Sequence, residues 1–101
     1  MAPKTLPIDL IVEDPEIRGG RPVVAGTTIR VSDVVAYHLF DGQSPEELAV
    51  GFALDLSQVH AVLSYYHGHR AEIDAEIRAN ADEAERWRLE LTRRESHRFV
   101  G

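Results

Sequence analysis

Five histidines are the side chains in this 101-residue chain best suited to hold a metal ion, and three of them lie close together in the sequence. A helical zinc site uses histidines three or four residues apart, because that spacing puts both rings on one face of the helix. His60 and His67 would share a face, but His67 and His69 would point well apart. We therefore expect no metal site and no cofactor, with these rings bonded to the backbone or to a carboxylate instead.

Patterns for covalent catalysis are absent from the sequence. The chain has no Cys, which also excludes disulfides and Cys-ligated metal sites. It contains no Gly-x-Ser-x-Gly motif, no phosphate-binding glycine loop and no dinucleotide-binding fingerprint. A chain this short also rarely encloses a substrate pocket of about 300 Å³ or more. We therefore expect a protein that is not an enzyme, and the lack of thiols is compatible with the cytoplasmic location that we predict.

Polar residues suited to reading DNA lie where a third helix is predicted to begin. Two short helices joined by a tight turn follow a first helix, which is the outline of a helix-turn-helix. In that arrangement Ser57, Gln58 and Ala61 would face base edges in the major groove. Phosphate contacts would come from three arginines that precede the helices, Arg18, Arg21 and Arg30. The alternative is that the three helices serve only as a scaffold.

Capping residues place the starts of these three helices. Ser32 or Asp33 would cap the first helix. The segment Ser44-Pro45-Glu46-Glu47 combines a capping hydroxyl, a first-turn proline and a glutamate three residues past the cap. Asp55 or Ser57 would cap the third helix. The middle third of the chain is therefore predicted to hold three short helices with tight connections.

A small β element is predicted before the helices. Apolar residues alternate through residues 8–12, which indicates a short strand that ends before Pro15. Val23-Val24 and residues 29–31 flank a glycine-containing turn and indicate a small hairpin or tight corner. The expected fold class is therefore mainly α, with a small β element first.

The charge balance is acidic. Seventeen Asp and Glu residues against 11 Lys and Arg residues give a net charge of −6, which is a poor match to nonspecific binding of DNA or anionic membranes. Through Arg70 there are nine acids and five bases, so a DNA contact would need a local basic patch. No apolar run reaches the roughly 20 residues that span a bilayer. A second class of function stays open, a non-enzymatic dimeric interaction module that binds no DNA.

The last third of the chain is predicted to be one charged helix with an apolar seam. The seam residues alternate steps of four and three, a heptad pattern of about three repeats. They are Ile73, Ile77, Ala84, Trp87 and Leu91, with Asn80 in the same seam. Because surface charge pairs contribute only about 0.3 kcal/mol each, the seam must be covered by the protein's own core, by a second copy or by another protein. The predicted partner contacts are Ile73, Ile77, Trp87 and Leu91.

Several ordered motifs resemble the family named domain of unknown function 433. The first is the run from Asp14 to Val31, with an Asp-Pro step, a Gly-Arg-Pro step and a Gly-Thr step before an apolar-x-Val ending. The second is Ser44-Pro45-Glu46-Glu47-Leu48, and residues 59–66 followed by residues 69–74 complete the match. The resemblance covers about residues 8–78. It implies a homeodomain-like helix-turn-helix that follows a small β element.

Many members of that family are similar to VapB-type antitoxins of type II toxin–antitoxin pairs, and their neighbours are often PIN-like ribonucleases. The resemblance therefore implies an antitoxin-like protein that binds a PIN-like ribonuclease toxin through a C-terminal segment. It also implies that the helical domain binds the protein's own promoter DNA. We expect a homodimer or higher oligomer in which residues 1–78 hold the β element and the helix-turn-helix. Residues 79–101 would form a helical extension, either part of the same domain or a partner-binding tail.

Overall fold

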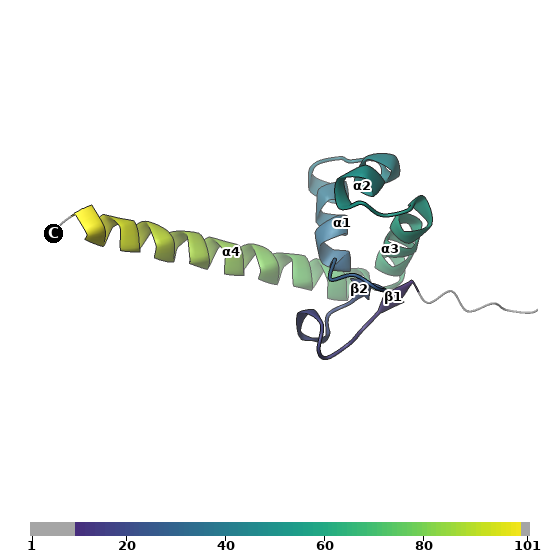
Figure 1. The fold of residues 1–101 in the computed structure, drawn as a ribbon, viewed down its shortest axis with the longest axis horizontal. Coiled ribbons are helices and arrows are strands. Elements are labelled where there is room, and N and C mark those ends of the chain that lie inside the picture. Colours follow the sequence, from purple (N-terminus) through teal and green to yellow (C-terminus); the bar gives the residue numbers. More distant parts are fainter. Residues whose placement is uncertain (1–9, 100–101) are drawn as a thin grey trace, which may run out of the picture.

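The computed structural model describes the backbone of residues 10–99 and the side chains of residues 10–95. Three short helices and a small β element form a head, and a long fourth helix leaves it as an arm (Figure 1). The elements are β1 (Ile11–Val12), η1 (Arg18–Gly20), β2 (Val23–Val24), α1 (Val31–Phe40), α2 (Pro45–Phe52), α3 (Leu56–Gly68) and α4 (Arg70–Phe99). This order confirms the predicted mainly α fold, while the predicted start of the first strand at residue 8 lies outside the described residues.

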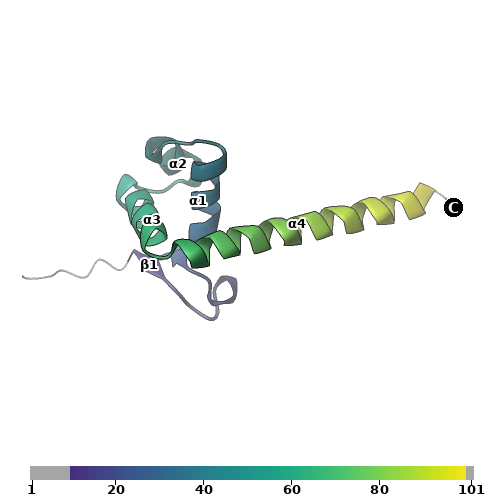
Figure 2. The ribbon, with the colours of Figure 1, turned by 180° about the vertical axis from the view of Figure 1, so that it is seen from behind.

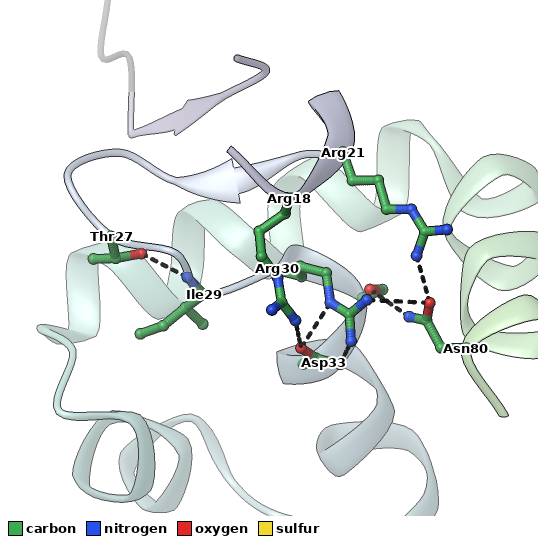
Figure 3. Close-up of polar contacts among 8 residues, drawn as sticks. Arg18, Arg21, Thr27, Ile29, Arg30, Asp33 and Asn80 are labelled. Atoms are coloured by element: carbon green, nitrogen blue, oxygen red, sulfur yellow. Dashed lines mark hydrogen bonds and ion pairs between the residues drawn. The ribbon is translucent and has the colours of Figure 1, made fainter. Parts of the chain in front are cut away.

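The β element positions the start of α1. β1 and β2 form a two-stranded antiparallel sheet whose register pairs Ile11 with Val24. The Thr27 hydroxyl accepts the Ile29 N–H at 3.0 Å (Figure 3). The same hydroxyl donates to the Val24 carbonyl at 2.8 Å, and the two bonds fix the turn after β2. The chain then reaches Arg30, which occupies the N-cap position of α1. The turn therefore holds Arg30 beside the β element.

α1 begins earlier than the capping pattern predicts. With Arg30 at the N-cap, neither Ser32 nor Asp33 caps the helix, and that prediction is wrong. Both side chains have other partners. The Ser32 hydroxyl accepts a hydrogen bond from the Asn80 amide at 3.1 Å, and the Asp33 carboxylate accepts two from the Arg30 guanidinium. A distant residue therefore binds the Ser32 hydroxyl, and the residue at the N-cap itself binds the Asp33 carboxylate, so neither group caps the helix.

α2 and α3 both begin with capping boxes. The Ser44 hydroxyl accepts the Glu47 N–H at 3.2 Å, and the Glu47 carboxylate accepts the Ser44 N–H at 3.1 Å. At α3 the N-cap is Asp55, whose N–H donates to the Gln58 side-chain oxygen at 2.7 Å. These contacts confirm the predicted helix starts and select Asp55 over Ser57 as the cap.

The core lies where β2, the three short helices and the first turns of α4 meet. Its members are Val24, Val31, Val34, Val35, Leu48, Leu54, Val59, Val62, Tyr66 and Ile73. Ile73 is only 1% exposed, so the prediction that it contacts a partner is wrong: its side chain packs inside the head. Ile77 is partly buried and packs against the same core from its edge. The first turns of α4 therefore belong to the head.

α4 starts directly after α3, with His69 at the break between them. Its 30 residues make a rod of about 45 Å, of which only the beginning lies against α1 and α3 (Figures 1 and 2). The helix runs through residue 78 without interruption. The backbone thus has no break at the predicted boundary between residues 1–78 and 79–101.

Most of the exposed arm is polar. Arg88 pairs with Glu85, Arg93 pairs with Glu90, and Arg94 lies 3.4 Å from the same Glu90 carboxylate. Such exposed i,i+3 and i,i+4 pairs contribute only about 0.3–0.5 kcal/mol each.

Among the described residues, no single helix combines the length and the apolar composition needed to cross a bilayer.

Candidate functional site

α2 and α3 have the geometry of a helix-turn-helix. The two helices meet at 114°, and three residues, 53–55, join them. The motif typically has an angle of roughly 90–120° and a turn of about three to four residues. Ala53 ends α2 in the left-handed conformation with φ 55°, and the buried Leu54 anchors the turn in the core. The backbone therefore holds α3 at the angle typical of a recognition helix.

The residues predicted to read DNA from α3 differ in their accessibility. Ser57 is exposed and Ala61 is half-buried, and both line a hollow that also contains Tyr65. Gln58 is turned back toward the helix start, where its side-chain oxygen accepts the Asp55 N–H at 2.7 Å. In the free chain this oxygen completes a helix cap, so reading adenine would require the cap to open.

The helix-turn-helix surface lacks the positive charge that phosphates require. Between Arg30 and Arg70 the sequence contains no Lys or Arg, but it contains five acidic residues. Three of them, Glu46, Glu47 and Asp55, lie on α2 or at the start of α3. DNA affinity comes largely from Lys and Arg that neutralise phosphates, so the charge of this unit opposes what its geometry allows.

The three predicted phosphate contacts gather at the junction of head and arm (Figure 3). Arg30 binds Asp33 through two hydrogen bonds, Nε to Oδ2 at 3.0 Å and Nη2 to Oδ1 at 3.1 Å. Arg18 Nη2 lies 3.9 Å from the same Asp33 carboxylate. Arg21 instead reaches across to α4, where its Nη1 donates to the Asn80 side-chain oxygen at 2.6 Å. The structure therefore brings Arg18, Arg21 and Arg30 together, around one carboxylate and one amide.

Asn80 ties the arm to the head. Its oxygen accepts hydrogen bonds from Arg21 at 2.6 Å and from Arg30 at 3.3 Å, while its amide nitrogen donates to the buried Ser32 hydroxyl at 3.1 Å. Sequence reasoning placed Asn80 in the seam but gave it no role. A polar Asn in an otherwise apolar heptad seam is the signal that could have marked it as a residue with specific partners.

A hollow opens beside this cluster, and we call it the arginine hollow. It is lined by Arg18, Arg30, Asn80, Glu83, Ala84 and Trp87. One wall carries guanidinium groups from the head, and the other carries an indole, a methyl group and one carboxylate from α4. The Arg18 side chain is 43% exposed, whereas that of Arg30 is 19% exposed. Arg18 is therefore the more accessible of the two cations.

Beyond the hollow, the predicted seam of α4 is uncovered. Trp87 is 58% exposed and Leu91 is 53% exposed. Leu89 is 59% exposed but lies on the opposite face, because two residues turn an α-helix by about 200°. Of the four predicted partner contacts, only Trp87 and Leu91 are thus accessible, since Ile73 is in the core and Ile77 packs at its edge.

Three histidines, His38, His67 and His69, make bonds to other groups of the chain. His38 Nδ1 lies 2.8 Å from the Gln43 carbonyl oxygen, and His69 Nδ1 lies 2.9 Å from the Tyr65 carbonyl oxygen. These two contacts confirm the predicted bonding to the backbone for His38 and His69, whereas His67 Nδ1 lies 2.9 Å from Arg70 Nη2, which is neither backbone nor carboxylate. In the part of the chain that the structure describes, no group of three or more His, Asp or Glu side chains is placed to hold a metal ion.

Two tyrosines connect α3 to the elements around it. The Tyr66 hydroxyl donates to Asp74 Oδ1 at 2.9 Å, and this bond together with burial raises the pKa of Tyr66 above its ordinary value. The Tyr65 hydroxyl donates to Glu13 at 3.3 Å, and burial together with the Glu13 charge raises the pKa of Tyr65. Both hydroxyls therefore stay protonated near neutral pH and act as structural donors.

The comparisons with known proteins give a family match for the head but not for the arm. No curated protein and no solved structure matches this chain. The family described as "Protein of unknown function (DUF433)" matches residues 11–66, which run from β1 into the last turn of α3. This span contains Arg18, Arg21 and Arg30 but ends before Asn80 and the exposed seam. Because the match covers more than half of the chain, the chain belongs to the DUF433 family.

Proposed function

We propose that this chain is an antitoxin-like binding protein without enzymatic activity, which holds a PIN-like ribonuclease toxin in the cytoplasm through the arm. The observation that carries the proposal is the exposure of Trp87 and Leu91 on a helix that leaves the head (Figure 1). Tryptophan is among the residues most enriched at the energetic centres of protein interfaces. A helix supported only by surface ion pairs gains stability when a partner covers its apolar side.

The spacing of the exposed seam fits recognition of a helix by a groove. Ala84, Trp87 and Leu91 stand at positions i, i+3 and i+7, the anchor spacing with which an amphipathic helix lies in an apolar groove. The small Ala84 lets a partner approach the backbone closely, and the two large side chains fill pockets. The partner surface is therefore an apolar groove that accepts an indole and an isobutyl group.

Rescue of growth and complex formation test this proposal. The full chain is co-expressed with the product of the adjacent open reading frame, as wild type, as Trp87→Ala/Leu91→Ala, and as the matched control Leu89→Ala. The altered side chains are more than half exposed, so all three proteins should show the same helical content by circular dichroism. Wild type and the control should restore growth, and the double variant should not.

The affinities give the sharper readout. Loss of interface anchors costs about 2 kcal/mol or more, so the double variant should bind at least about 30-fold more weakly. Leu89→Ala should stay within about twofold of wild type, as expected for a surface change outside the interface. An equal loss of affinity in Trp87→Ala/Leu91→Ala and in Leu89→Ala, or no complex with the wild-type chain, would refute the proposal.

A second candidate is a dimeric interaction module, in which a second copy covers the same seam. The charge distribution along α4 favours it: residues 70–85 hold six acids and two bases, whereas residues 86–99 hold two acids and five bases. Two antiparallel arms would set the acidic half of each against the basic half of the other. Light scattering of the chain alone tests this candidate, because a dimer of this kind should dissociate in high salt and in the Trp87→Ala/Leu91→Ala variant.

Promoter binding is the less supported part of the antitoxin-like proposal. The angle between α2 and α3 supports it, and the acidic surface of the same helices opposes it. A contact with DNA would have to use the arginine cluster and would fall steeply with salt. If Arg21→Ala and Gln58→Ala leave the affinity for the promoter fragment unchanged at low salt, the DNA-binding role is rejected.

A further inference from the structure

We propose that the arginine hollow is a carboxylate-binding site, which receives an acidic side chain of the partner protein while the seam of α4 receives apolar ones. The identity of that partner rests on the proposed function. The preference for a carboxylate, however, is a property of this chain alone and is measured without the partner.

The arginine cluster, Arg18, Arg21 and Arg30, has more positive charges than there are carboxylates around it. Arg18 and Arg30 share the single carboxylate of Asp33. Arg21 and Arg30 both donate to one neutral amide oxygen, that of Asn80, at 2.6 and 3.3 Å. The Asn80 amide is neutral, so its oxygen satisfies one donor of each guanidinium without balancing the charge of either. Three guanidinium groups face the carboxylate of Asp33 and, across the hollow, that of Glu83, so one positive charge is left in excess for a further anion.

One guanidinium is placed to receive that anion. Arg18 approaches Asp33 at 3.9 Å, which is beyond hydrogen-bond distance, so within the described part of the chain its N–H groups keep their capacity for a closer acceptor. Its side chain is 43% exposed and lines the hollow. Figure 3 shows Arg18 and Arg30 converging on Asp33 from the head, with Asn80 beside them. An anion in the hollow therefore meets Arg18 first.

The far wall of the hollow favours a protein carboxylate over the phosphates of a nucleic acid. Glu83 lines the hollow. A chain of phosphates would bring repeated negative charges against this carboxylate. A single carboxylate with apolar neighbours meets less of that repulsion and contacts Trp87, whose indole belongs both to the hollow and to the seam. The hollow and the seam thus form one continuous surface for a segment that is acidic at one point and apolar around it.

The test uses short peptides and the chain's single tryptophan, which stands in the wall of the hollow. The probe is acetyl-Leu-Glu-Leu-amide, its neutral control is acetyl-Leu-Gln-Leu-amide, and inorganic phosphate at matched ionic strength is the third arm. Trp87 emission and the Tm of the full chain are measured against wild type, Arg18→Gln and Arg94→Gln. Arg94 is 65% exposed on the distal arm, so Arg94→Gln makes the same change in net charge outside the hollow.

We expect the Glu peptide to shift Trp87 emission and to raise the Tm of wild type and Arg94→Gln. A ligand at about ten times its Kd raises the Tm of a domain of this size by several degrees. Binding should be at least tenfold weaker to Arg18→Gln, and the Gln peptide should bind at least tenfold more weakly to wild type, each equivalent to about 1.4 kcal/mol. If Arg18→Gln does not fold, Asn80→Asp replaces it, because a carboxylate inside the cluster should weaken the Glu peptide in the same way.

Three results with the peptides would overturn the proposal. The first is equal binding of the Glu and Gln peptides to wild type, and the second is an equal loss of affinity for the Glu peptide in Arg94→Gln and Arg18→Gln. The third is no change in Trp87 emission or Tm with the Glu peptide at about 10 mM, a concentration above the millimolar Kd expected of one charged contact. A larger stabilisation by phosphate than by the Glu peptide would also overturn it and would assign the hollow to a phosphate group. None of these outcomes changes the result expected for the Trp87→Ala/Leu91→Ala variant with the toxin, so the two proposals fail separately.

Discussion

Replacing Asn80 with Asp should stabilise the protein, although a new charge in a partly buried position is usually harmful. The change keeps the size and shape of the side chain and turns the oxygen shared by Arg21 and Arg30 into a carboxylate. Both bonds already have a charged donor, so what the change adds is the attraction of two ion pairs; at up to about 1 kcal/mol for each partly exposed pair, the gain is roughly 2 kcal/mol before any correction.

Two effects reduce that gain. The bond from the Asn80 amide to Ser32 is lost, although the Ser32 hydroxyl can rotate and donate to the new carboxylate. The site is only partly buried, so solvent screens the added attraction. We expect a net stabilisation of about 1 kcal/mol, which for a domain of about 100 residues raises the Tm by about 4–8 °C.

Urea unfolding followed by circular dichroism measures the difference, with Asn80→Leu as the control. Leu fills the space but accepts nothing, so Arg21 and Arg30 lose their shared acceptor at a cost of about 1–3 kcal/mol. The gain in Asn80→Asp should shrink as salt is raised, because screening weakens charge pairs. If Asn80→Asp is destabilised to the same degree as Asn80→Leu, the two guanidinium groups do not converge on this oxygen, and the charge argument for the arginine hollow fails with it.

Two further changes test the bonds that hold the helices. In Tyr66→Phe the hydrogen bond to Asp74 is lost, at a cost of about 1 kcal/mol near neutral pH. That bond and burial raise the folded-state pKa of Tyr66, so its contribution to stability is complete below the unfolded pKa of about 10 and is lost as the pH rises through the folded pKa. The variant should therefore lose less stability than wild type in urea titrations above about pH 10, and an equal alkaline loss would contradict this cause. Ser44→Ala should lose about 1 kcal/mol by removing the capping box of α2, with Ser44→Thr restoring most of it, and an unchanged urea midpoint would show that the cap is dispensable.

Local patterns predicted the elements because each depends on neighbouring residues. The Ser44-Pro45-Glu46-Glu47 box needs only an i to i+3 contact, so the sequence contains everything that forms it. The prediction for α1 was wrong for the opposite reason. Ser32 is bonded to Asn80, which is 48 positions away, and no local pattern announces such a contact. Because the distant Asn80 binds the Ser32 hydroxyl, Ser32 does not cap α1 although its type suits a helix cap.

The candidate site was only half predictable for the same reason. Sequence reasoning chose Arg18, Arg21 and Arg30 as anion contacts, and the structure does gather them, but beside Asp33 and Asn80. Arg21 and Asn80 are 59 positions apart, so their bond depends on how α4 packs on the head. The seam shows the same limit, because periodicity put Ile73 and Trp87 in one stripe but could not tell which of them the head already covers.

The origin of the two walls of the arginine hollow bears on how a partner is selected. The guanidinium wall lies within residues 11–66, the part of the chain that the DUF433 family matches, whereas Asn80, Glu83 and Trp87 lie beyond it. A change confined to α4 therefore alters the chemistry facing the arginines while leaving the arginines in place. Since Asn80 also holds the arm to the head, one substitution there would change both the charge of the hollow and the attachment of the seam. In the proposed complex, affinity from the seam and selectivity from the hollow would thus be coupled through a single residue, and the Asn80→Asp variant is the one in which both should be measured.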